Sequence, residues 1–191
     1  MRKLIAVAVL VLAFAGVVYL YHNATTPYRT LPAVEVNAVQ AAAAQRKVDA
    51  LRNPGGGGAT GQPARVSENF SDSELSSLAN QELQSESLPL DNLVLHATAD
   101  GRIEGLATAH WGGQALPLFL EATVQVVGGD QLQLTIVDSK LGQLNVPASL
   151  AGQINSAVMQ SVNLGQALQM DDVRIAISQG MVTVSGVAKP A

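Results

Sequence analysis

Apolar and polar residues alternate along the middle of the chain, between residues 115 and 141. From residue 116 to 126 every second side chain is apolar, and the side chains between them are mostly polar. After a turn at residues 128–130 the alternation resumes over residues 131–136. Since side chains of a pleated strand point alternately to its two faces, this period of two predicts a long antiparallel hairpin with one apolar and one polar face. The apolar face needs a cover, which the rest of the chain must supply.

Two amphipathic helices and two further hairpins flank this central hairpin. Ser71 and Glu74 have the S-x-x-E spacing of a capping box, which predicts a helix start there. Pro147 predicts the first turn of a second helix, because proline is favoured at that position. Both helices carry apolar side chains at helical spacing on one side. The outer hairpins are predicted at residues 88–109 and 168–188.

The last hairpin repeats the pattern of the first. The pattern LxxDxLxLxA at residues 88–97 matches LxxDxVxIxI at residues 168–177, and Gly101 and Gly180 then mark the two turns. An amphipathic helix precedes each hairpin. The match predicts an internal duplication of helix and hairpin around the central hairpin.

Together these elements predict an α+β domain at residues 64–191. Six or seven antiparallel strands would form a curved sheet wrapped on one or two amphipathic helices. Aromatic residues make up 4% of the chain, and the inward-facing residues are mainly aliphatic, so the core either closes completely or leaves an apolar groove. The candidates for lining a groove are Leu118, Leu120, Val124, Leu134, Ile136, Leu150, Ile154 and Val158.

The N-terminus carries an apolar run at residues 4–20, preceded by Arg2 and Lys3. At a rise of 1.5 Å per residue the run is about 26 Å long, close to the hydrocarbon core of a bilayer. The preceding positive charges favour a cytoplasmic N-terminus, so we expect a single transmembrane helix at residues 1–21. Ala13 and Ala15 allow a cleaved signal peptide instead, although cleavage there would leave an exposed apolar start. Both alternatives place the domain outside the cytoplasm.

The stretch at residues 22–63 is predicted to be a tether. An Ala-rich segment at residues 35–52 favours a short helix, either a stalk or a loosely docked helix, because alanine buries little area. The glycine- and proline-rich sequence that follows disfavours helix and strand, and it is predicted to be a linker to the domain.

Charge and composition exclude several classes of function. Residues 63–191 contain five Lys or Arg and thirteen Asp or Glu, and an acidic domain is a poor partner for nucleic acid. The chain has no cysteine, which excludes disulfides and thiolate chemistry. No nucleophile-elbow motif or paired-carboxylate signature is found, so we expect no enzyme activity and no cofactor.

Three histidines and one tryptophan remain as candidates for chemistry. His96 and His110 could form a metal site with Glu104 or Glu121, but no metal-ligand spacing supports one, and solvent-facing histidines are expected. Trp111 precedes two glycines and therefore lies in a turn. We expect its ring to pack against that turn, the alternative being a position at a membrane interface or a pocket mouth.

The order of these motifs resembles a known bacterial group. An N-terminal anchor, an Ala-rich stalk and the sequences FSDSELSSLAN, LPLDNLVLHATADGRIEG, LQLTIVDSKLGQLNVPASL and VRIAISQGMVTVSG look like the LmeA-like and YpmS-like phospholipid-binding families, related in shape to the tubular lipid-binding superfamily. The resemblance covers residues 65–188. It implies a curved antiparallel sheet around a long helix, an apolar cavity that takes acyl chains, and no catalytic residues.

Two functions follow as expectations. The first is a lipid-binding module at the outer face of the membrane, with phospholipid or fatty acid as its partner, held between the apolar face at residues 118–126 and the helix at residues 150–158. The second is a structural or scaffolding protein of the cell envelope with a closed core. The two differ in whether a cavity of several hundred Å³ exists.

Overall fold

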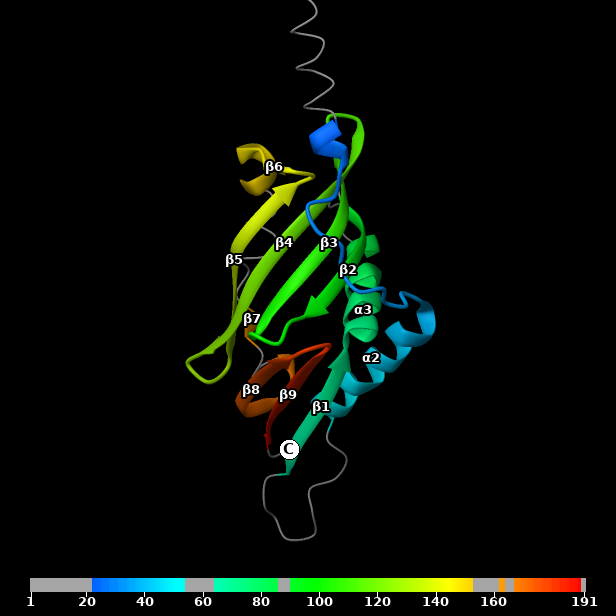
Figure 1. The fold of residues 1–191 in the computed structure, drawn as a ribbon. Coiled ribbons are helices and arrows are strands. Elements are labelled where there is room, and N and C mark those ends of the chain that lie inside the picture. Colours follow the sequence, from blue (N-terminus) through cyan, green and yellow to red (C-terminus); the bar gives the residue numbers. More distant parts are fainter. Residues whose placement is uncertain (1–21, 54–63, 86–89, 153–161, 164–166, 190–191) are drawn as a thin grey trace, which may run out of the picture.

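The computed structural model describes residues 22–53, 64–85, 90–152, 162–163 and 167–189. The chain has an α+β fold with two antiparallel sheets (Figure 1). The helices α2 and α3 cover Ala38–Arg52 and Asp72–Ser85. The strands are β1 (Arg65–Ser71), β2 (Leu90–Ala97), β3 (Arg102–Trp111), β4 (Gln114–Val127), β5 (Gln131–Leu141), β6 (Leu144–Asn145), β7 (Val162–Asn163), β8 (Met170–Ser178) and β9 (Met181–Ala188).

The strands divide between a six-stranded and a three-stranded sheet, where the sequence predicted one. The larger sheet has the order β2-β3-β4-β5-β6, with β7 also paired to β5. The smaller sheet has the order β1-β9-β8. The closing hairpin is thus as predicted, but it takes β1 as its neighbour, in the register Arg65↔Val187 to Ser71↔Met181. Alternation predicts which residues share a face and not which strand a hairpin pairs with, so this division was not foreseen.

The predicted apolar face of the central hairpin is confirmed. Leu118 lies opposite Leu141, and Val124 lies opposite Leu134, so these pairs point to the same side of the sheet. We call this side the leucine face and the other the polar face. The leucine face comprises Ala107, Ala109, Leu116, Leu118, Leu120, Ala122, Val124, Leu134, Ile136, Ser139 and Leu141.

A β-bulge interrupts β5 within this face. Glu121 pairs with Asp138 and Ala122 with Ile136, which leaves Val137 without a partner on β4. The extra residue changes which positions point to the leucine face, from even numbers before the bulge to odd numbers after it. The side chain of Val137 is exposed as a result.

Helix α3 lies along the free edge of β2 and takes the place of a neighbouring strand. Three polar side chains, one turn apart on the helix, bond the outward-facing backbone groups of β2. Asp72 Oδ1 accepts the N–H of Ala97 at 2.9 Å, and Ser76 Oγ accepts the N–H of Leu95 at 2.8 Å. Asn80 accepts the N–H of Leu93 at 3.0 Å and donates to its carbonyl at 2.5 Å. A helix with polar side chains at these positions therefore protects an edge strand.

Replacing Asn80 by alanine should destabilise the domain by about 1–3 kcal/mol, because both backbone groups of Leu93 lose their partner. The loss is measurable by denaturant unfolding, with faster hydrogen exchange at the Leu93 amide. Gln81→Ala, at an exposed position of the same helix, should change stability by less than about 0.5 kcal/mol. An equally small effect of both substitutions would contradict the edge-capping role.

The predicted capping box at the start of α3 is confirmed, and its glutamate also binds α2. Glu74 Oε2 accepts the N–H of Ser71 at 2.9 Å, and Ser71 Oγ accepts the N–H of Glu74 at 3.3 Å. The Glu74 carboxylate also pairs with the ammonium of Lys47. Burial alone would raise the pKa of Glu74, but the hydrogen bonds from Lys47 and Ser71 hold it below its ordinary value.

Helix α2 is docked on the domain, which decides between the two arrangements that the sequence left open. Ala44 and Leu51 are fully buried. They belong to a core cluster with Phe70 of β1, Met170 and Val173 of β8, and Leu168, which precedes β8. Alanine side chains bury little area, but they let the helix backbone approach the sheet closely, so the Ala-rich segment packs where bulkier residues would not fit.

The two outer hairpins share a local irregularity that supports the predicted duplication. In β2 the register shifts between Asp91 and Val94, and in β8 it shifts between Asp171 and Arg174. The bulged residues Asn92 and Asp172 have φ values of 53° and 52°. Asn and Asp tolerate this left-handed conformation best among non-glycine residues, so the repeat preserves a bulge together with the residue type that permits it.

Candidate functional site

The structure brings four of the eight groove candidates together at one end of the leucine face. Leu118 and Leu150 are fully buried and belong to one core cluster. Leu120 and Ile136 are half-buried and pack against this cluster. Val124 and Leu134 lie opposite each other further along the same face and are also half-buried. The remaining candidates, Ile154 and Val158, fall outside the described residues.

A pocket of about 340 Å³ opens beside this cluster. Its apolar lining comes from the leucine face, from the bulged residue Val137 and from the segment that follows β6. Its polar lining comes from the end of β5 and from β6. Lys140 Nζ donates to Asn145 Oδ1 at 2.7 Å, which links the two strands at the rim. The apolar residues of the pocket are Leu120, Ile136, Val137, Val146 and Ala151, and the polar ones are Asp138, Ser139, Lys140 and Asn145.

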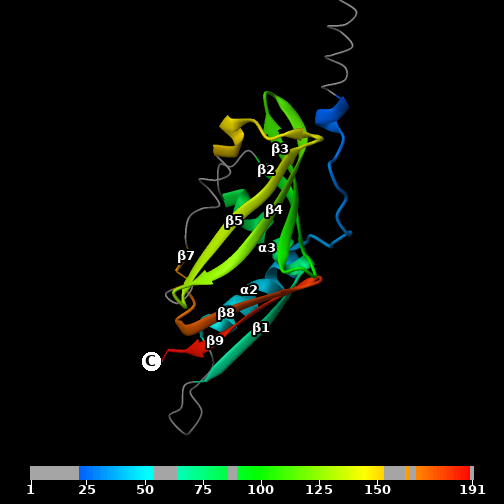
Figure 2. The same cartoon turned by 60° about the vertical axis from the view of Figure 1, so that its left-hand side comes forward.

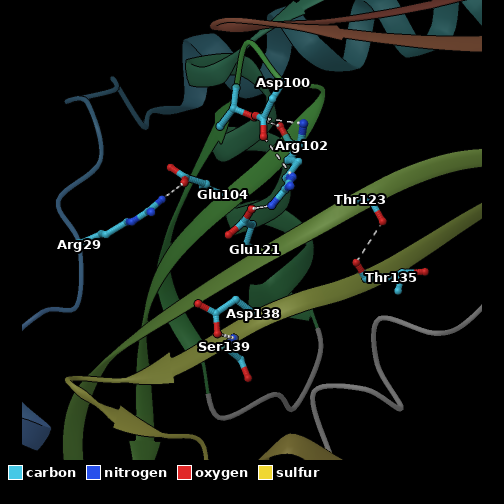
Figure 3. A network of polar contacts seen from close by, with 10 residues as sticks. Arg29, Asp100, Arg102, Glu104, Glu121, Thr123, Thr135, Asp138 and Ser139 are labelled. Carbon is cyan, nitrogen blue, oxygen red and sulfur yellow. Dashed lines mark hydrogen bonds and ion pairs between the residues drawn. The ribbon is translucent and has the colours of Figure 1, made fainter.

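Two carboxylates face each other on the polar face, and each is neutralised by an arginine (Figure 3). Glu104 on β3 pairs directly with Glu121 on β4. Arg29 forms an ion pair with Glu104, and Arg102 forms one with Glu121. The hydrogen bond that Arg102 donates to Glu121 is the main reason why the pKa of Arg102 lies above its ordinary value. These carboxylates are therefore occupied as counter-ions on the surface of the sheet.

The histidines pair with different carboxylates. His96 Nδ1 lies 2.5 Å from Asp72 Oδ2, and His110 Nε2 lies 2.9 Å from Asp91 Oδ2. Within the described residues, no group of three His, Asp or Glu side chains is placed to hold a metal ion. His110 is exposed as expected, but His96 is half-buried, because α3 covers the edge of β2 beside it.

A segment that the sequence did not identify crosses the polar face. Residues 22–37 run along the sheet from the β5–β6 turn to α3, and we call them the strap (Figure 2). Gln143 donates its backbone N–H to the carbonyl of Asn23 at 2.7 Å, and at the other end Asn37 donates its N–H to Ser77 Oγ at 3.1 Å. Between them the ring of Tyr28 lies 5.3 Å from that of Phe119.

Phe119 explains how the strap is held and could have suggested it. The residue occupies a polar-face position of β4, yet it is almost completely buried. The guanidinium of Arg29 lies 5.5 Å from the centre of its ring, a cation–π distance. An aromatic residue at an otherwise polar strand position indicates a second layer on that face, but nothing nearby in the sequence identifies the partner.

None of the helices in the part of the chain that the structure describes is long and apolar enough to cross a membrane. The predicted anchor at residues 1–21 lies outside that part. No family model, no curated protein and no solved structure matches this chain.

Proposed function

We propose that this chain is a membrane-anchored, extracytoplasmic protein that binds the acyl chain of a phospholipid or fatty acid. The observation that carries the proposal is the pocket of about 340 Å³ at the end of the leucine face. Leu120 and Ile136, selected from the alternation of the sequence, line it together with Ala151. The five apolar lining residues offer contacts to a hydrocarbon chain, and the four polar residues offer partners for a polar headgroup.

The energetics favour binding through the chain. Each methylene group moved from water into an apolar site contributes about 0.8 kcal/mol, so even partial insertion of an acyl chain offsets the cost of ordering it. The rim holds Asp138 and Lys140, whose charges cancel, so an anionic headgroup gains little there. The volume lies near the lower end of the roughly 300–1,000 Å³ of small-molecule sites, which favours one chain over a whole two-chain lipid.

The resemblance to the LmeA-like and YpmS-like families supports the same proposal, since those families imply an apolar cavity and no catalytic residues. The apolar run at residues 4–20 supports membrane attachment with the domain on the outer side. In this arrangement the protein would bind lipid from the membrane that anchors it, in a role in envelope lipid homeostasis.

Photocrosslinking tests the proposal on the full chain. The protein is reconstituted into vesicles that contain a phospholipid with a diazirine on its acyl chain. After illumination, crosslinks should map to β5 and to residues 145–151, in addition to the anchor at residues 4–20, which serves as the positive control. Ala151→Phe should remove the pocket crosslinks by filling the space, whereas Ala148→Phe, at an exposed position one turn earlier, should leave them unchanged.

One observation favours the alternative of a scaffolding protein with a closed core. Leu118 and Leu150 belong to one core cluster and are almost completely buried, so the leucine face is filled around them. The same experiment separates the two functions. Crosslinks confined to the anchor in the unsubstituted chain would reject the lipid pocket and leave the scaffold.

A further inference from the structure

Three segments without formally charged residues meet at one end of the six-stranded sheet, where the side chains of Asp91 and Lys140 contact them. They are residues 22–28 of the strap, residues 108–117 around the β3–β4 turn, and residues 141–152 from the β5–β6 turn onward (Figure 1). None of the three contains Asp, Glu, Lys or Arg, although 14% of the whole chain is charged. We call this part of the molecule the uncharged end.

Direct contacts hold the three segments together. Gly142 donates its N–H to the carbonyl of Pro117 at 2.7 Å, and Gln143 donates to the carbonyl of Asn23 at the same distance. Ala24 packs against the core cluster that contains Leu116 and Leu150. The uncharged end is therefore one packed surface that includes the first described residues of the chain.

The chain's single tryptophan lies at the tip of this end. Trp111 pairs with Gln114 across the β3–β4 turn and continues the row of Ala107 and Ala109 on the leucine face. Its side chain is 44% exposed, so it is not the packed turn aromatic that the sequence favoured. An amphipathic ring with a polar N–H is the side chain that settles best at the boundary between lipid and water.

We propose that the uncharged end rests on the outer surface of the membrane, with Trp111 in the lipid interface. The proposal rests on the anchor of the proposed function. The apolar run ends at residue 20, and the two residues to His22 reach at most about 7 Å, so the start of the strap must lie at the bilayer surface. Because that start is bound to the β5–β6 turn, the whole uncharged end is brought there with it.

This orientation places the pocket beside its source of ligand. Asn145, Val146 and Ala151 line the pocket and belong to the uncharged end. The charged residues of the β2–β3, β4–β5 and β8 regions, among them Asp100, Asp130 and Asp171, lie toward the other end of the sheets. An acyl chain could then pass from the bilayer into the pocket along this end, past the rim residues Asp138 and Lys140.

Tryptophan fluorescence tests the orientation on the full chain, because every photon of tryptophan emission comes from Trp111. The protein is reconstituted into vesicles of phosphatidylcholine, with or without bromine near the headgroup end of the acyl chains. We expect emission from Trp111 to shift to the blue, to be shielded from acrylamide, and to fall by roughly half in brominated vesicles, as for a ring at the interface.

A matched control moves the reporter to the other end of the six-stranded sheet, from the end of β3 to the end of β4. In the double variant Trp111→Phe, Val127→Trp, the new ring replaces a side chain that is 47% exposed at the β4–β5 turn. Strand β4 spans 14 residues, roughly 45 Å at the rise of a β-strand, so this ring should stay open to acrylamide and unquenched by bromine.

Flotation of the vesicles separates the two proposals. Protein that floats with the vesicles, but whose Trp111 is quenched no more than the ring in the control, would overturn the orientation and leave the anchor intact. Protein that does not float would overturn the anchor and the orientation together. If the unsubstituted chain gave no pocket crosslinks in the photocrosslinking experiment while Trp111 was quenched, the lipid pocket alone would be rejected.

Discussion

Gly142→Ala is expected to disrupt the packing of the strap on the sheet and to lower the free energy of unfolding by about 3 kcal/mol. A Cβ at this position would lie 2.3 Å from the carbonyl oxygens of both Asn23 and Ala24. The residue also has a φ of +59°, a conformation that carries an intrinsic penalty for alanine. Denaturant unfolding of the full chain in mild detergent measures the loss. Limited proteolysis should show new cleavage within residues 22–36.

The clash and the backbone penalty can be separated. Gly129 has a similar φ of +86°, but a Cβ there would meet nothing within 4 Å. Gly129→Ala should therefore lose only about 1 kcal/mol and leave the strap protected from protease. If both variants were equally stable, the contact between the β5–β6 turn and the strap would not exist as described.

Leu118→Asp should unfold the domain or destabilise it by several kcal/mol. The side chain of Leu118 has no exposed surface and lies between Ala107 on β3 and Leu141 on β5. A carboxylate at this position would be removed from water among aliphatic side chains, with no cation on the leucine face to pair with. Circular dichroism and a loss of soluble, protease-resistant domain report the result.

A control substitution lies on the same strand, at a residue whose side chain points to the opposite face of the sheet. Gln125 is exposed on the polar face, opposite Gln133, so Gln125→Asp should change stability by less than about 0.5 kcal/mol. Equal losses at Leu118 and Gln125 would mean that the strand is displaced by one residue, which would reverse every inward assignment.

Local patterns predicted the elements that depend on neighbouring residues. The alternation at Leu118 and Leu120, the capping box of Ser71 and Glu74, and the glycine turns all rest on interactions within a few residues, and all appear in the structure. The parity change at Val137 is also visible in the sequence once β4 is known to be the partner. A bulge is defined by a pairing, so it could not be read from β5 alone.

The strap and the division into two sheets depend on contacts between distant residues. Gln143 and Pro27 are held together by a side-chain hydrogen bond across 116 positions. No pattern in the sequence links these two residues, and beyond a single helical turn at residues 22–25 the strap has no regular structure that periodicity could reveal. The pocket was predicted as a continuous groove along the leucine face, but its extent depends on how the second helix and β6 meet β5, which composition does not determine.

The pairing of β1 with β9 also determines when the protein can fold. These strands join residues near the start of the domain to residues near its end, from Arg65↔Val187 onward, and the core cluster under α2 requires Leu168, Met170 and Val173. Because synthesis proceeds from the N-terminus, β1 and the apolar side of α2 must stay uncovered until the last strand has been made. The smaller sheet therefore forms late, and the chain is most exposed to aggregation and proteolysis just before it forms.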